Sequence, residues 1–401
     1  MRVAHTSHAL SAFPVYSSAF LSQSELVIGG GGGATKSGIK NKLRAFHVGN
    51  DRSIEQKHEL ELARGEDAPM SMATDGKTIV CGINSASEML EKGENENCRV
   101  FDVDDGKLSF VRAKGTLLVK PDDLDFQKVT VLSFDGSLLA VAGPNDLSLL
   151  SYPSLMPVAQ SLKLDKEIYD ATFMKTKLIV ATTADLQVYS LPDTSTNTAS
   201  PSKSKKKGKQ KASTSLPLLV CEHVIDIPSL FGGASGSSFR AARIHPTLDT
   251  VLYTVVNTVP SRSRGKSGPR QAYVSKWNTE NWTVEKTRKV GDRGITCFSI
   301  SPDGKLLGYG SSDLSVGLLD ATTLNPVSTI LKAHEFPPTT LAFNTNSSLL
   351  VSGSADNSIR VITLPDQVRG SNWSFFMLII LTLIVLMVAY ALQRYSNTFG
   401  W

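Results

Sequence analysis

The sequence predicts an all-β fold that is built from repeated units and followed by one membrane-spanning helix. Three observations support this. Short apolar runs with strand-like composition recur along the 401 residues, whereas long amphipathic helical patterns do not. Residues 301–319 and 344–362 repeat each other at an offset of 43. Residues 373–392 form an almost wholly apolar run near the C-terminus. A chain of this length can bury a large core, as one repeat domain or as two to three ordinary domains.

The repeat indicates the kind of unit. Residues 301–319 are SPDGKLLGYGSSDLSVGLL and residues 344–362 are NTNSSLLVSGSADNSIRVI, so that Gly310 matches Gly353 and Asp313 matches Asp356. A turn, a short apolar strand, a small-residue turn and an alternating strand, repeated about every 40–45 residues, are typical of a four-stranded propeller blade of the WD-repeat type. The Trp-Asp dipeptide itself is absent, so the repeats are degenerate.

Weaker copies of this pattern give apolar cores near residues 27, 80, 140, 180 and 253, which with those near 307 and 350 make seven. Seven cores predict a seven-bladed β-propeller. His334 and Asp356 are predicted to form the link that ties a turn to a loop in the last blade. That blade supplies three strands, about 339–344, 349–353 and 358–364. We expect the N-terminal MRVAHT to supply the fourth, since pairing the first and last segments removes two sheet edges.

A lysine-rich insertion interrupts the repeats at residues 193–216. It carries six lysines and one aspartate, which accounts for the whole net charge of +5. Its composition predicts a disordered surface loop, and attachment to anionic lipid stays open as an alternative. Because the remainder is neutral, the folded part offers no basic face for nucleic acid. The four cysteines lie far apart with no CxxC pair, so the sequence resembles neither a disulfide framework nor a zinc site.

The apolar run predicts a transmembrane helix at residues 370–393, because twenty residues of helix span about 30 Å of hydrocarbon. The N-terminus lacks a continuous apolar stretch of the signal-peptide kind. We therefore expect a cytosolic propeller at residues 1–369 and a short luminal tail at 394–401. Arg360 and Arg369 before the span, against Arg394 after it, favour the same orientation weakly.

Five consecutive glycines lie between two apolar runs in IGGGGGATKSGIKNKL, residues 28–43. The spacing of Lys36 and Ser37 does not fit a Walker A loop, and the next segment is strand-like, so the helix that a dinucleotide site needs is missing. Glycines instead let a loop fold tightly, present its tip, or turn several carbonyls onto a hard cation. A structural hairpin loop is the simpler alternative.

The glycine run, followed by Gly-Ile-x-Asn-Lys-Leu within a degenerate propeller that has a C-terminal span, resembles the Sec twelve family. The stretches EDAPMSM (66–72) and KAHEFPPTTLAF (332–343) are similar to that family as well. Its members are guanine nucleotide exchange factors of the endoplasmic reticulum membrane for the small GTPase Sar-one, which starts COPII coat assembly. The resemblance implies single-pass anchoring in that membrane, with the propeller facing the cytosol, and transport from the endoplasmic reticulum to the Golgi.

The resemblance also implies site residues. Asn41 would make the decisive polar contact with the GTPase and Ile39 the apolar one, both held outward as a rigid probe. Further GTPase-binding residues would be Gly38, Lys42, Asp67 and Pro69. A potassium ion would be bound by backbone carbonyls of Gly29, Gly30, Gly31, Gly32 and Gly33. Lys40 stands where some members have proline, which makes the loop less preorganised.

The function expected from the sequence is therefore nucleotide exchange without covalent catalysis. Two alternatives remain at this point: a membrane-tethered propeller scaffold that binds another protein, and an enzyme that uses the central channel. The second is disfavoured because no convergent acid, base or metal set is visible in the sequence.

Overall fold

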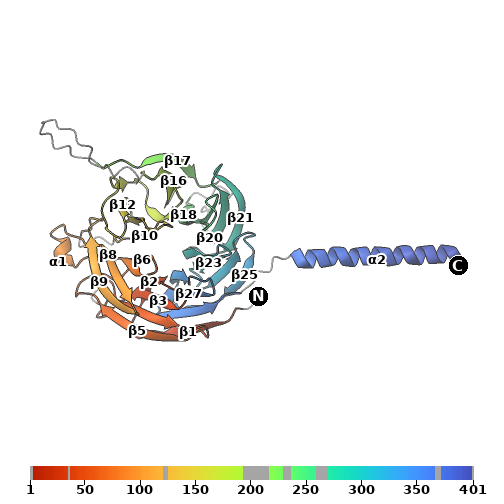
Figure 1. Cartoon of the computed structure of the whole chain (residues 1–401), viewed down its shortest axis with the longest axis horizontal. Coiled ribbons are helices and arrows are strands. Elements are labelled where there is room, and N and C mark those ends of the chain that lie inside the picture. The colour runs from red at the N-terminus through yellow and green to blue at the C-terminus, as the bar shows by residue number, and fades with distance from the viewer. Residues whose placement is uncertain are drawn as a thin grey trace, which may run out of the picture. The chain divides into compact units, whose positions relative to one another are not determined.

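The computed structural model describes residues 3–34, 37–120, 125–192, 216–228, 236–258, 270–365 and 372–399. The chain divides into two compact units, Met1–Leu364 and Pro365–Trp401. Within the described residues of the first unit, seven antiparallel sheets of four strands each stand around a central axis as the blades of a propeller (Figure 1). The predicted all-β, seven-bladed fold is confirmed.

The strands follow one another blade by blade. The first three blades are β2 (Val15–Phe20), β3 (Glu25–Gly30), β4 (Lys42–Val48) and β5 (Ile54–Glu61); β6 (Ser71–Thr74), β7 (Thr78–Gly82), β8 (Cys98–Asp104) and β9 (Lys107–Lys114); and β10 (Val129–Leu132), β11 (Leu138–Ala142), β12 (Asp146–Ser151) and β13 (Leu162–Lys163). A short helix, α1 (Ser87–Leu90), lies between β7 and β8.

The next three blades are β14 (Ile168–Phe173), β15 (Lys177–Thr182), β16 (Asp185–Ser190) and β17 (Val220–Asp226); β18 (Ser238–Ile244), β19 (Val251–Thr258), β20 (Gln271–Asn278) and β21 (Thr283–Gly291); and β22 (Ile295–Ile300), β23 (Leu306–Ser311), β24 (Val316–Asp320) and β25 (Pro326–Ile330). The last blade contains β26 (Pro338–Phe343), β27 (Leu349–Ser354) and β28 (Ser358–Thr363).

The seven apolar cores seen in the sequence are the second strands of the seven blades. Residues 27, 80, 140, 180, 253, 307 and 350 lie on β3, β7, β11, β15, β19, β23 and β27, and these strands are buried along most of their length. A second strand is paired on both edges and is covered on both faces by neighbouring blades. It therefore shows a continuous apolar run instead of the alternation of a half-exposed strand.

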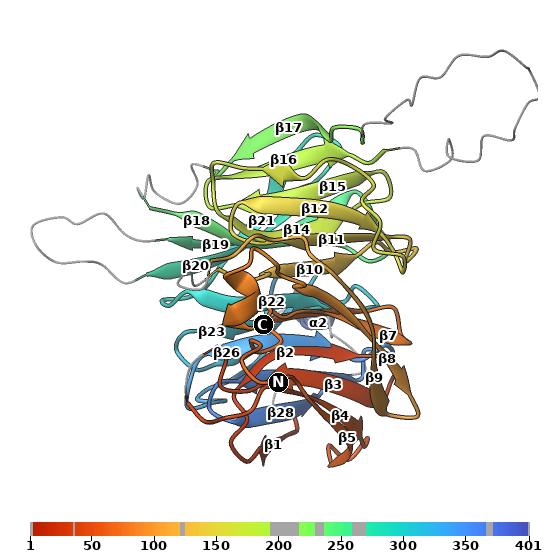
Figure 2. The ribbon, with the colours of Figure 1, turned by 90° about the vertical axis from the view of Figure 1, so that its left-hand side faces the viewer.

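The ring is closed by the N-terminal strand. β1 (His5–Ala9) pairs antiparallel with β28, from His5 opposite Ile362 to Ala9 opposite Ser358. Figure 2 shows the two strands side by side, although one is the first and the other the last strand of the propeller in the sequence. A shared apolar cluster joins the first and last blades and includes Phe13, Ile28 and Val361. The predicted closure by the first residues is thus confirmed.

The predicted link between His334 and Asp356 is present as well. Nδ1 of His334 lies 3.3 Å from Oδ2 of Asp356, and both side chains are almost wholly buried. The imidazole also forms hydrogen bonds with the hydroxyls of Ser352 (2.8 Å) and Ser358 (2.9 Å). Burial lowers the pKa of His334 below its usual value, and this outweighs the opposite effect of the Asp356 charge.

Two sequence-based predictions concern parts that the structure describes little or not at all. The lysine-rich insertion lies outside the described residues except for Leu216. The second unit contains α2 (Asn372–Phe399). Among the residues that the structure describes, no helix combines the length and the apolar composition that a bilayer crossing requires. The transmembrane helix at 370–393 and the tail at 394–401 therefore stay predictions.

Candidate functional site

The five glycines serve two different elements. Gly29 and Gly30 belong to β3, where they stand opposite Leu43 and Lys42 of β4. A side chain at either position would collide with a neighbour. A Cβ on Gly29 would lie 2.6 Å from Cβ of Pro69, and one on Gly30 would lie 2.1 Å from the carbonyl oxygen of Pro14. These two glycines are therefore explained by close approach of the surrounding chain.

Residues 31–41, which we call the glycine loop, connect β3 to β4 and include two undescribed positions, 35 and 36. Gly31 and Gly33 have φ angles of 139° and 70°, which residues with a side chain rarely adopt. The N–H of Gly31 donates to the carbonyl of Pro14 at 2.9 Å. The glycines thus allow a turn that other residues would strain.

Asn41 holds this loop from its C-terminal end. Its Oδ1 accepts a hydrogen bond from the N–H of Gly33 at 2.9 Å, and its Nδ2 donates to the Gly33 carbonyl at 2.9 Å and to the Glu66 carbonyl at 2.7 Å. We expected the Asn41 side chain to be held outward. The structure instead turns its amide inward, because the Gly33 backbone groups and the Glu66 carbonyl need partners at this partly buried position.

The segment that receives Asn41 is the connection between β5 and β6, and an ion pair fixes it to the second blade. Nη1 of Arg99, on β8, lies 2.6 Å from Oε1 of Glu66, and the two side chains are only 9% and 17% exposed. The other carboxylate oxygen of Glu66 accepts from the N–H of Ala63 at 2.9 Å. Neither residue of this pair was singled out by the sequence. Arg99 lies 33 positions from its partner, and no local pattern indicates the contact.

Asp67 and Pro69 lie beside the glycine loop. Oδ1 of Asp67 is 3.4 Å from the position that a Cβ on Gly33 would take, and it accepts a hydrogen bond from the N–H of Ala68 at 2.7 Å. Burial raises the pKa of Asp67, although backbone hydrogen bonds from Ala68 and Ala34 act in the opposite direction. Pro69 is buried, and its carbonyl accepts from the hydroxyl of Ser17 at 2.6 Å.

The tip of the loop is more open. Gly38 has a φ of 78°, and a Cβ on it would meet nothing within 4 Å. Ile39 is half-buried, whereas Lys40 is exposed and pairs with Glu61 at 2.6 Å. Lys42 is turned to the neighbouring strand β5, where it forms an ion pair with Glu59. The tip therefore offers Gly38 and part of Ile39 to a partner more freely than Lys42 or Pro69.

A cation beside this loop is compatible with the residues present. No group of three or more histidine, cysteine, aspartate or glutamate side chains suited to a metal ion occurs among the described residues. The Asp67 carboxylate, however, forms no ion pair with the described part of the chain, and its raised pKa marks an acid that an adjacent cation would stabilise as the anion. Gly29 and Gly30 are paired within the sheet on both sides of β3. The backbone carbonyls that could bind the ion are therefore those of Gly31, Gly32 and Gly33.

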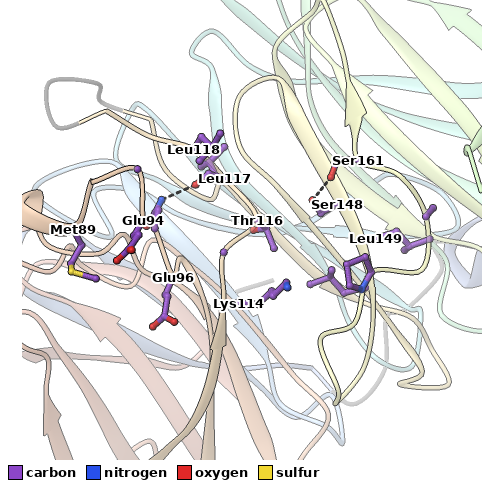
Figure 3. A pocket seen from close by; sticks show the side chains of 16 residues that line it. Met89, Glu94, Glu96, Lys114, Thr116, Leu117, Leu118, Ser148, Leu149 and Ser161 are labelled. Atoms are coloured by element: carbon purple, nitrogen blue, oxygen red, sulfur yellow. Dashed lines mark hydrogen bonds between the residues drawn. The ribbon is translucent and has the colours of Figure 1, made fainter. Parts of the chain in front are cut away.

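A separate pocket lies between the second and third blades, with a volume of about 500 Å³ (Figure 3). Its lining includes Glu94, Glu96 and Lys114, together with Leu117, whose carbonyl accepts a hydrogen bond from Asn95 at 3.0 Å. The described lining contains no histidine or cysteine. The hydroxyls of its two serines, Ser148 and Ser161, form a hydrogen bond with each other at 2.9 Å.

Comparison with known proteins agrees with the fold. Residues 325–363, which run from the end of the sixth blade through β28, match the family "WD domain, G-beta repeat".

Similarity to individual proteins extends much further. The chain is 24% identical to the "Guanine nucleotide-exchange factor SEC12" of Candida glabrata, over 97% of this chain and 79% of that protein. It is 22% identical to the protein of the same name from Mus musculus, over 94% of this chain and 96% of that protein. It is also 22% identical to the "Putative guanine nucleotide-exchange factor SED4" of Candida glabrata, over 90% of this chain but only 32% of that longer protein. The chain therefore resembles the SEC12 guanine nucleotide-exchange factors along almost its entire length.

Proposed function

We propose that this protein is a guanine nucleotide exchange factor that releases GDP from a small GTPase of the Sar-one type and so starts COPII coat assembly at the endoplasmic reticulum. The support is the glycine loop, whose residues match the Sec twelve pattern and whose backbone is fixed by Asn41. Relatives named as exchange factors along nearly the whole chain favour the same function.

The proposed mechanism is differential binding. An exchange factor accelerates nucleotide release if it binds the nucleotide-free GTPase more tightly than the GDP-bound form. A loop that is already ordered loses little conformational entropy on binding, so more of the contact energy is available to stabilise the nucleotide-free complex. Gly38 and Ile39 at the tip would contact the GTPase, while Asn41, Glu66 and Arg99 would keep the loop in place.

Potassium belongs to this proposal as an ion held by the carbonyls of Gly31, Gly32 and Gly33 and by the Asp67 carboxylate. When bound, it would supply positive charge that keeps these oxygen atoms together. The chain's own residues set the loop path in either case, because the two φ angles and the Asn41 hydrogen bonds are features of the protein.

We further propose that the apolar segment at 370–393 anchors the protein in the endoplasmic reticulum membrane with the propeller in the cytosol. Large apolar side chains between Met377 and Leu392 are exposed on α2, as a lipid-facing helix would require. Anchoring would confine the activated GTPase to the membrane on which it is needed.

The test is the rate at which a fluorescent GDP analogue leaves a purified Sar-one-type GTPase in the presence of the full-length chain in detergent. We expect clear acceleration in potassium buffer, slower release in lithium buffer, and no acceleration with an unrelated small GTPase. Stable binding of the GTPase without faster release would contradict exchange activity and favour the scaffold alternative.

A further inference from the structure

The channel opening at the propeller axis holds a second set of polar residues. All seven blades contribute to it through their first strands, and its volume is about 600 Å³, within the range of ligand-binding cavities. Its lining includes Lys128, Tyr169, Arg240, Thr296 and Tyr16. Because each blade repeats the same strand order, the first residues of these strands lie at one end of the channel.

Most charges in the opening are already balanced. Lys128 forms an ion pair with Glu167, and Arg243 forms one with Asp170. The Asp170 carboxylate also accepts hydrogen bonds from the backbone N–H groups of Ala171 (3.0 Å) and Ala242 (2.9 Å), so it serves to join β14 to β18. The charges of these four side chains are neutralised by one another, so they require no ligand.

Arg240 differs from them. Its Nη2 donates to the backbone carbonyl of Thr296 at 2.8 Å, and within the described ranges of the chain no carboxylate lies close enough to form an ion pair with it. The guanidinium stands over the ring of Tyr169, with Cζ 5.1 Å from the ring centroid. Nζ of Lys128 lies 5.7 Å from the same centroid. The ring of Tyr169 thus makes cation–π contacts with both Arg240 and Lys128 at the channel opening.

This arrangement suits an oxyanion. A guanidinium that is fixed by a ring and by one carbonyl still has N–H groups to offer, in the planar geometry that matches a carboxylate or a phosphate. The protein walls around the opening strengthen the attraction between Arg240 and an entering anion. We therefore propose that the channel opening binds an oxyanion group, phosphate or carboxylate, through Arg240.

The proposed site is near the glycine loop but separate from it. Tyr16, in the channel lining, lies close enough to Asp67 for the Asp67 charge to add to the effect of burial in raising the tyrosine pKa. Ser17 donates to the Pro69 carbonyl. The glycine loop and the channel opening therefore face the same end of the propeller. A protein docked on the glycine loop could also place an acidic group in the channel. No residue of the oxyanion site belongs to the loop.

The test measures binding of two probes, inorganic phosphate and a triglutamate peptide, to the full-length protein by calorimetry. We expect at least one probe to bind, and Arg240→Gln to weaken that binding at least about tenfold. Arg240→Lys should retain part of the affinity because it keeps the charge. Arg112→Gln should leave binding unchanged, since Arg112 is an exposed arginine on the outer strand β9.

The two probes distinguish the sources of the oxyanion. Binding of phosphate alone assigns a phosphorylated ligand, and binding of the peptide alone assigns an acidic protein segment. Thermal melting of each variant establishes that it is folded. The proposal is overturned if neither probe binds at concentrations up to about 10 mM, or if folded Arg240→Gln binds as tightly as the wild type.

Discussion

Asn41 illustrates how one side chain can organise a loop with few other attachments. Its amide oxygen accepts one hydrogen bond and its nitrogen donates two, so the whole carboxamide is used within the protein. An aspartate would lose both donors and would face two carbonyl oxygens with a negative charge. The sequence motif indicated the importance of this residue but not its direction, because its partners are backbone groups that carry no side-chain signal.

His334 gives the residue-scale prediction. Its pKa is lowered by burial, so below about pH 6.5 the unfolded chain binds more protons than the folded one at this position. We expect the free energy of unfolding to fall as the pH decreases from about 7 to about 5. Denaturant unfolding of the wild type and of His334→Gln, measured across this range, checks the contribution of this residue.

Subtracting the free energy of unfolding of His334→Gln from that of the wild type removes the contribution of other groups, such as His245, whose pKa is also lowered by burial. The stability advantage of the wild type over His334→Gln should shrink as the solution becomes more acidic. An advantage that is constant or grows toward pH 5 would show that His334 is not held in its neutral form.

At the scale of elements, the glycine loop depends on a contact between neighbouring blades. Arg99 on β8 holds Glu66 in the connection between β5 and β6, and the Glu66 carbonyl in turn receives the Asn41 amide. Sequence periodicity can find a strand, since its apolar residues are local. It cannot find a bond between residues of two blades, because that depends on how the blades pack.

Arg99→Met should therefore loosen the glycine loop from a distance. It leaves the Glu66 carboxylate unpaired at a site that is 17% exposed, and we expect a loss of about 1–3 kcal/mol in the free energy of unfolding. Hydrogen exchange of residues 31–41 should become faster, and GDP release from the GTPase should become slower. Chemical denaturation, hydrogen exchange and the release assay provide the three measurements.

Lys57→Met is the matched control, because it breaks an ion pair with Glu55 on the same strand. The side chain of Lys57 is 43% exposed and that of Glu55 is 66% exposed. It should cost less than about 1 kcal/mol and leave the loop unchanged. If Arg99→Met slows GDP release no more than Lys57→Met does, the ion pair does not support the loop.

At the scale of the whole molecule, the sequence predicted the blade number because each second strand is buried along most of its length and forms an apolar run. It predicted closure because three strands near residues 339–364 need a fourth. It did not predict α1 or the two-residue strand β13, since elements this short lack periodicity. A central channel was considered from the sequence, but the residues that line its opening were not identified, because they come from seven separate strands.

The proposed membrane orientation makes a prediction about glycosylation. Asn281 and Asn346 lie in acceptor sequences, and both are exposed, so burial would not protect them from modification in the lumen. We expect both to stay unmodified when the full-length protein is produced in eukaryotic cells. An added N-terminal signal peptide should send the propeller into the lumen and is the positive control. An endoglycosidase-sensitive mass shift at either site of the natural chain would reverse the orientation.

If the glycine loop carries exchange activity, Asn41→Ala should slow the release of GDP from the GTPase. The variant removes three hydrogen bonds from a surface loop, whereas the apolar clusters between the blades are untouched. The melting temperature should therefore change by only a few degrees. A loss of about 2–4 kcal/mol in the nucleotide-free complex would slow release by roughly 30- to 700-fold.

Ser133→Ala is the control for this measurement, because it also removes side-chain hydrogen bonds from an exposed turn, far along the chain from the glycine loop. GDP should leave the GTPase at the wild-type rate with Ser133→Ala and far more slowly with Asn41→Ala, although both variants are folded and melt within a few degrees of the wild type. If GDP leaves the GTPase at the wild-type rate with Asn41→Ala, the glycine loop does not carry exchange activity and is only a structural hairpin.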